Sequence, residues 1–227
     1  MKRTALLTAS LFLISTVLVA QNRPDGTTPQ GENLKVPIGW ELRLDRPNPD
    51  VIIGDDIETA DIYFVNMTPG WHIKTGPAAI FYHPENTISG SYNISSEFHL
   101  FDPGERNREA FGIFFGGKNL DKENQQYVYF LIRNTGEYLI KTRNGDETPN
   151  IQRWTATDAM HKFTEETEDS AANTFLVDVN SDKITFYLNG TELTSIPSNG
   201  VETDGLFGMR INHSNDVHVT SLVIGQK

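Results

Sequence analysis

Four side chains near the middle of the sequence have the types and the spacing of a ligand-binding surface. They are Tyr129, Arg133, Lys141 and Arg143. Aromatic rings stack on the apolar faces of sugar rings, and arginine forks bind carboxylates or paired hydroxyl groups. The alternative is ordinary cross-strand pairing on an exposed sheet, with Tyr129 opposite Lys141 and Arg133 opposite Glu137.

A β-hairpin would place these side chains together. Its strands stay in phase only if the turn consists of residues 134–136, with Gly136 supplying a positive φ. One face then carries Val128, Phe130, Ile132, Tyr138, Ile140 and Thr142. The opposite face carries Tyr127, Tyr129, Leu131, Arg133, Leu139, Lys141 and Arg143. We therefore predict that the first face belongs to the core and that the second is an aromatic and cationic surface.

Glu97 and His99 form a second pair with possible chemistry. Apolar and polar residues alternate over 92–100, which is typical of a strand buried on one face, and Glu97 and His99 share its polar face. A carboxylate beside an imidazole can transfer protons or hydrogen-bond a sugar, whereas the alternative is a plain solvent-facing strand. We expect these two residues to share a sheet face with the hairpin surface.

Three more residues are candidates for the rim of this site. Trp71 and Trp154 lie in segments that we expect to be loops, where large rings either hold sugars or cover the edge of a core. Arg210 follows an apolar strand residue, where it forms a structural ion pair or stabilises a negative charge.

We expect no cofactor from the sequence, although the sequence does not exclude a bound calcium ion. Asp56 and Asp61 precede a strand and can bind Ca²⁺ through oxygen, but they lack the spacing of an EF-hand. His72, His99 and His213 can meet at a metal, yet nothing in their spacing requires it. The sequence contains no cysteine, which excludes disulfides and thiolate chemistry.

Short strand patterns separated by Gly, Pro and Asn recur along the chain, without the rhythm of parallel βαβ units. A second hairpin is expected to turn at Ser181 and Asp182, followed by a strong turn signal at Asn189 and Gly190. One short helical turn is expected within 156–172. The strand segments predicted are 38–44, 62–65, 78–82, 92–100, 111–115, 127–133, 137–143, 175–179, 184–188, 206–211 and 217–224. This pattern predicts an all-β fold, a two-layer antiparallel sandwich of the jelly-roll type.

The N-terminal composition indicates an exported protein, periplasmic or extracellular. Residues 1–20 have a basic start and a short apolar run, which is typical of a signal peptide. Residues 21–35 are polar and rich in Pro and Gly, so we expect a flexible leader. The remaining segment, 36–227, is expected to form a single jelly-roll domain, and no later stretch is apolar enough to span a membrane.

The charge balance narrows the class of partner. The formal net charge is −11, which disfavours nucleic acid and anionic membranes as partners. Neutral glycans fit this surface more easily. An acidic polysaccharide would require a local basic patch, which Arg133, Lys141 and Arg143 would supply. The oligomeric state cannot be predicted.

Two long segments resemble the closing half of concanavalin A-like jelly rolls. They are NTFLVDVNSDKITFYLNGTEL (173–193) and DGLFGMRINHSNDVHVTSLVI (204–224), and segments 97–117 and 129–138 resemble the middle strands. The resemblance extends over about 36–225 and includes laminin-G-like domains and the keto-disaccharide hydrolase-like domain of exported bacterial proteins. Because this fold is shared by lectins, hydrolases, lyases and adhesion modules, the resemblance implies the fold more than an activity.

The resemblance also implies a test for hydrolysis. Retaining hydrolases of this fold carry three acids on one strand face, as E-x-D-x-E or E-x-D-x-x-E, and the sequence has no such run. We therefore expect a carbohydrate-binding module that does not use the paired-acid route. A glycan-cleaving hydrolase or lyase, with Glu97 or His99 as acid–base, and a non-enzymatic adhesion module are the alternatives.

Overall fold

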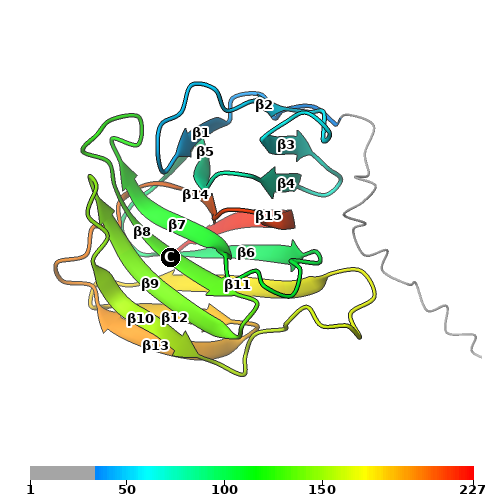
Figure 1. The fold of residues 1–227 in the computed structure, drawn as a ribbon. Helices are drawn as coiled ribbons and strands as arrows, with labels where there is room; N and C mark the ends of the chain where they lie inside the picture. The colour runs from blue at the N-terminus through cyan, green and yellow to red at the C-terminus, as the bar shows by residue number, and fades with distance from the viewer. Residues whose placement is uncertain (1–33) are drawn as a thin grey trace, which may run out of the picture.

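The computed structural model describes residues 34–227 and contains two antiparallel sheets packed face to face (Figure 1). The expected signal peptide, and the expected leader except for its last two residues, lie outside the described residues. The seven-stranded sheet has the spatial order β1 (Glu41–Leu44), β5 (Ala79–Ile88), β14 (Gly205–Ile211), β7 (Ala110–Lys118), β8 (Gln126–Arg133), β9 (Glu137–Asn144) and β10 (Asn150–Ala156).

The eight-stranded sheet forms the second layer. Its spatial order is β13 (Thr191–Pro197), β12 (Lys183–Leu188), β11 (Ala171–Val179), β6 (Tyr92–Leu100), β15 (Asp216–Gln226), β4 (Trp71–Thr75), β3 (Ile62–Asn66) and β2 (Ile53–Gly54). All pairings in this layer are antiparallel except that of β2 with β3. The all-β sandwich predicted from the sequence is confirmed.

The main hydrophobic core lies between the two sheets. Phe130 of β8 contacts Phe175 of β11 and Phe186 of β12, with ring centroids 5.1 and 5.5 Å apart in edge-to-face geometry. All three rings are fully buried. Each such ring contributes about 1.5–3 kcal/mol through the apolar surface that it removes from water. This core fixes which face of each strand points outward, and so it determines the outer surface of each sheet.

Both predicted hairpins are confirmed. In the first, Leu131 lies opposite Leu139, Tyr129 lies opposite Lys141, and Gly136 has φ +87° in the turn. In the second, β11 and β12 pair across the turn at residues 181–182. The first hairpin buries its predicted core face between the sheets.

The chain also makes pairings between segments that are far apart in sequence. β14 lies between β5 and β7, and β15 lies between β4 and β6 (Figure 1). A strand from the end of the chain therefore lies in the middle of each sheet. These pairings depend on loop closure over long separations, for which a local pattern contains no signal.

Four strands are not among the predicted ones, namely β2, β4, β10 and β13. β10 and β13 are edge strands with mostly exposed or half-buried residues, so neither has clear apolar alternation. The helical turn expected within 156–172 is wrong, because that segment consists of β10's last residue, turns and the start of β11. No helix within residues 34–227 is long and apolar enough to cross a membrane.

Candidate functional site

A cavity of about 500 Å³ opens on the outer face of the seven-stranded sheet. It lies over β8, β9 and β10 and is closed on one side by β14 and by the residues that follow β1. The residues that line it are Asp45, Arg46, Tyr129, Leu131, Leu139, Lys141, Arg143, Asp146, Thr148, Trp154, Arg210 and Asn212. Five of these were predicted to bind a ligand from the sequence alone: Tyr129, Lys141, Arg143, Trp154 and Arg210.

The floor of the cavity is a second hydrophobic cluster rather than an open aromatic surface. Tyr127 and Tyr129 are only 3% and 4% exposed, and they pack with Leu131, Leu139 and other outward-facing residues of this sheet. The expectation of an exposed aromatic surface at Tyr129 is therefore wrong, because the outer face has a small core of its own. Burial raises the pKa of the Tyr129 hydroxyl to about 12, against the opposing effect of the Arg210 charge.

Arg210 and Asp45 form a buried ion pair at one wall of the cavity. The two terminal nitrogens of Arg210 donate to the two carboxylate oxygens of Asp45 over 2.7 and 2.6 Å. Arg210 also donates to the hydroxyl of Tyr127 over 3.1 Å, and its guanidinium lies 4.8 Å from the centroid of the Tyr129 ring. Burial alone would raise the pKa of Asp45, but the hydrogen bonds and the charge of Arg210 hold that pKa below its usual value.

Lys141 and Arg143 extend from β9 into the same cavity. Arg143 lies opposite Tyr127, and its guanidinium donates to the carbonyl oxygen of Gly145 and lies 3.5 Å from Asp146. Lys141 lies opposite Tyr129 and is half-buried. No carboxylate of residues 34–227 lies within ion-pair distance of Lys141. Arg46, at the rim of the cavity, also has no ion-pair partner among residues 34–227, so the cavity contains two cations that are free to bind a ligand.

Trp154 supplies the aromatic surface of the cavity. Its segment was expected to be a loop, but Trp154 lies in β10, and its half-buried ring packs at the edge of the outer hydrophobic cluster. The guanidinium of Arg133 lies 4.1 Å from the centroid of this ring. Arg133 is itself held by Glu137, with an Nη2–Oε2 distance of 2.7 Å. Arg133 therefore orients the ring from outside the cavity rather than lining it.

Glu97 and His99 do not join this site. They lie on β6, which belongs to the eight-stranded sheet, and they point away from the core on the opposite side of the sandwich. The expectation of one shared face is wrong, because strand order cannot be deduced from alternation within a strand. Glu97 accepts hydrogen bonds from Thr220 and His99, both over 3.0 Å, and these hold its pKa below the usual value although burial opposes them.

The histidines of the eight-stranded sheet form a row that differs from the predicted grouping. His218 of β15 lies opposite His72 of β4 and His99 of β6, whereas His213 lies elsewhere, 3.7 Å from Glu109. No group of three or more side chains in residues 34–227 is arranged to hold a metal ion.

Trp71 and the two aspartates considered for calcium have local roles. Trp71 lies in β4, not in a loop, and its ring packs on Trp40 at the edge of the core, with centroids 4.7 Å apart. Asp56 and Asp61 each accept a backbone N–H, from Glu58 and Ile52 respectively. These contacts explain their presence in the loop before β3 without an ion.

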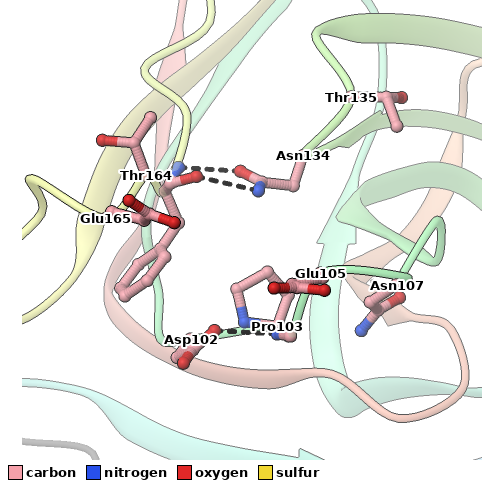
Figure 2. Close-up of a pocket in the computed structure, with 10 residues that line it drawn as sticks. Asp102, Pro103, Glu105, Asn107, Asn134, Thr135, Thr164 and Glu165 are labelled. Atoms are coloured by element: carbon pink, nitrogen blue, oxygen red, sulfur yellow. Dashed lines mark hydrogen bonds between the residues drawn. The ribbon is translucent and has the colours of Figure 1, made fainter.

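A second hollow of about 460 Å³ lies at one end of the sandwich and differs in charge (Figure 2). Asp102, Glu105 and Glu165 line it, and no lysine or arginine does. Figure 2 shows the Asn134 side chain bridging to the loop at residues 163–164, where it donates to and accepts from the Phe163 backbone. This hollow offers neither tryptophan nor cation, so the cavity beside Arg210 is the better candidate.

The sequence did not predict five polar residues that line the cavity, among them Asp146 and Thr148 in the turn after β9. Asp45 and Arg46 follow β1, and Asn212 follows β14. Asp45 meets Arg210 across 165 positions of sequence, and no local pattern links them. Alternation finds residues on strands, whereas these five lie in the turns that follow β1, β9 and β14.

Known structures share the fold at very low sequence identity. No protein-family model and no curated protein matches the sequence. The carbohydrate-binding module CBM66 from Bacillus subtilis superposes with a TM-score of 0.57 at 10% identity, covering 83% of this chain and 96% of that one. A GH16 protein of a Bacteroides ovatus mixed-linkage glucan locus, in complex with a G4G4G3G product, gives 0.55 at 6% identity and covers 82% and 94%.

A third known structure has a similar fold. It is a Bacillus subtilis protein of unknown function with a galectin-like fold, at a TM-score of 0.54 and 11% identity, covering 87% of this chain and 97% of that one. The fold is therefore that of the concanavalin A-like and galectin-like β-sandwich proteins. Likeness at this level of identity shows the fold alone.

Proposed function

We propose that this chain is a carbohydrate-binding module whose ligand occupies the cavity on the outer face of the seven-stranded sheet. The observation that carries the proposal is the convergence of an aromatic ring and paired polar groups in one hollow: Trp154, the Arg210–Asp45 pair and Lys141. A sugar presents an apolar ring face together with hydroxyl groups. This combination of an aromatic surface with fixed donors and acceptors matches both.

The structures with the same fold support the proposal. CBM66 is by its name a carbohydrate-binding module, and the GH16 protein was solved with a glucan product. The fold is thus compatible with sugar ligands, while the choice of site rests on the residues of this chain.

The protonation states in the cavity favour binding over proton transfer. Both oxygens of Asp45 are engaged by Arg210, and Asp45 has a lowered pKa, so it is a poor general acid. Tyr129 has a pKa raised to about 12 and is a poor base near neutral pH. The second carboxylate, Asp146, is fully exposed at the rim. These groups are better suited to hold hydroxyls than to cleave a bond.

The test is a glycan array that includes neutral and anionic polysaccharides, probed with the wild-type protein and Trp154→Ala. Truncating a stacking ring should weaken binding of the best glycan about fivefold or more, because stacking on one aromatic ring contributes about 1–3 kcal/mol. Tyr187→Ala is the matched control, since Tyr187 is a half-buried aromatic residue on the outer face of the other sheet.

Trp154→Ala should lose the array signal while its Tm stays within a few degrees of the wild type, and Tyr187→Ala should keep the signal. Equal binding by both variants would refute this location of the site. Absence of any glycan signal from the wild-type protein, with capture of a protein partner instead, would favour an adhesion module.

A further inference from the structure

The candidate cavity is a positively charged region on an acidic protein. The whole chain has a formal net charge of −11. The cavity nevertheless has four cationic side chains and only two carboxylates among its lining residues. The cations are Arg46, Lys141, Arg143 and Arg210, and the carboxylates are Asp45 and Asp146.

Two of the four cations are neutralised within the protein. Arg210 is bound by both oxygens of Asp45, and Arg143 lies 3.5 Å from Asp146. Lys141 and Arg46 have no ion-pair partner among residues 34–227. Lys141 is half-buried and lines the cavity, where an ion pair with a ligand is screened less by solvent than one on an open surface.

The hollow at the end of the sandwich has the opposite charge. The hollow at the end of the sandwich is lined by Asp102, Glu105 and Glu165 without any lysine or arginine (Figure 2). An anion approaching the molecule is therefore repelled by most of the surface and attracted at the cavity. Such focusing raises the rate of association as well as selectivity.

We propose that the sugar bound in this cavity is anionic, with a carboxylate or sulfate group that pairs with Lys141 while the sugar ring lies against Trp154. This inference rests on the proposed function, since it names the class of glycan for the same site. Arg46, exposed at the rim, supplies a second contact for a neighbouring charged unit. The Arg210–Asp45 pair then forms hydrogen bonds with the uncharged hydroxyl groups of the sugar.

The test uses two pairs of polysaccharides that share a backbone and differ chiefly in charge. Polygalacturonate is compared with its fully methyl-esterified form, and a sulfated galactan is compared with the same galactan after desulfation, by affinity electrophoresis and calorimetry. The wild-type protein should bind at least one anionic member about tenfold or more tightly than its neutral partner, and the affinity should fall as salt rises from 50 to 300 mM because ion pairing is screened.

Lys141→Met removes the charge and keeps most of the length of the side chain. It should lower affinity for the anionic member about tenfold and abolish most of the salt dependence. Lys183→Met is the control, because Lys183 is an exposed cation on the outer face of the other sheet. It should bind like the wild type.

Different results would overturn the anionic class of the ligand and the sugar-binding function itself. Neutral members that bind as tightly as anionic ones, with an affinity that Lys141→Met does not change, would overturn the anionic ligand and leave sugar binding intact. Failure of all four polysaccharides and of the glycan array would overturn both. If Lys141→Met does not fold, the salt dependence of the wild-type affinity decides, because a flat response excludes a charged ligand.

Discussion

Asp45 and Arg210 show how a residue contact links the fold to the candidate site. The pair is largely withdrawn from water, so its net contribution to stability is small even though its geometry is good. The pair acts mainly by positioning other groups. Its bidentate contact fixes the end of β1 against β14 and holds two polar groups at the wall of the cavity. The tyrosines beneath it complete the arrangement through the hydroxyl of Tyr127.

We predict that Asp45→Asn destabilises the protein by about 3 kcal/mol, because it leaves the buried Arg210 guanidinium without its counter-charge. Combining it with Arg210→Met should recover at least half of that loss, since the unpaired charge is then removed. Urea unfolding of the two single variants and the double variant measures the coupling. Simple additivity of the two losses would show that the pair is not the cause.

The turn between β12 and β13 requires two residues with positive φ. Asn189 and Gly190 connect β12 to β13, and both have positive φ, at 50° and 79°. The Asn189 side chain donates to the carbonyl oxygen of Ala159 and accepts from the backbone N–H of Thr174. The turn therefore anchors the 157–170 connection as well as reversing the chain.

Gly190→Ala is predicted to cost about 1–2 kcal/mol of unfolding free energy. A Cβ at Gly190 would meet no atom within 4 Å, so the whole cost comes from the left-handed backbone conformation. Gly190→Asn should cost less, because asparagine tolerates this conformation better than alanine. Thermal unfolding of the two variants provides the comparison, and an alanine variant as stable as the wild type would contradict the argument.

Much of this element structure could be predicted from the sequence, and the reason is the alternation of buried and exposed residues. β6 was predicted at its observed bounds, and the β8–β9 and β11–β12 hairpins were predicted in the observed register. Edge strands such as β10 lacked the pattern because neither face is fully buried. The candidate site was only half predictable, since alternation finds Lys141 but not the Asp45 that reaches it from another part of the chain.

The strand order explains the largest error about the site. Glu97 and Lys141 each lie on the outward face of a strand, which the sequence shows correctly. Their strands belong to different sheets, so the two residues are on opposite sides of the molecule. Sheet membership depends on long-range packing of the whole core, and a single sequence contains no direct record of it.

At the scale of the whole molecule, the outer face of the eight-stranded sheet carries an unusual buried polar group. The ring of His218 is fully buried, and neither of its nitrogens makes a hydrogen bond with residues 34–227. It faces His72 from β4 and both His99 and Glu97 from β6. His72 Nε2 in turn lies 2.8 Å from Asp216 Oδ1, although the two atoms are not aligned for a hydrogen bond.

This row makes global stability depend on pH in a defined direction. Burial, followed by the neighbouring charges of His99 and His72, lowers the pKa of His218 to about 3, while the charge of Glu97 opposes this shift. In the unfolded chain a histidine has a pKa near 6.5. Between about pH 3 and pH 6.5 the unfolded state therefore binds more protons than the folded state, and stability falls as pH falls through this window.

We predict that His218 alone lowers the unfolding free energy by about 2.7 kcal/mol between pH 7.5 and pH 4.5. His218→Leu should flatten most of this dependence, because leucine fills the buried position and binds no proton. His213→Gln, at an exposed histidine, should leave the slope as in the wild type. Urea denaturation at pH 4.5, 5.5, 6.5 and 7.5 measures all three proteins. A His218→Leu protein that loses as much stability in acid as the wild type would show that this ring is not the group responsible.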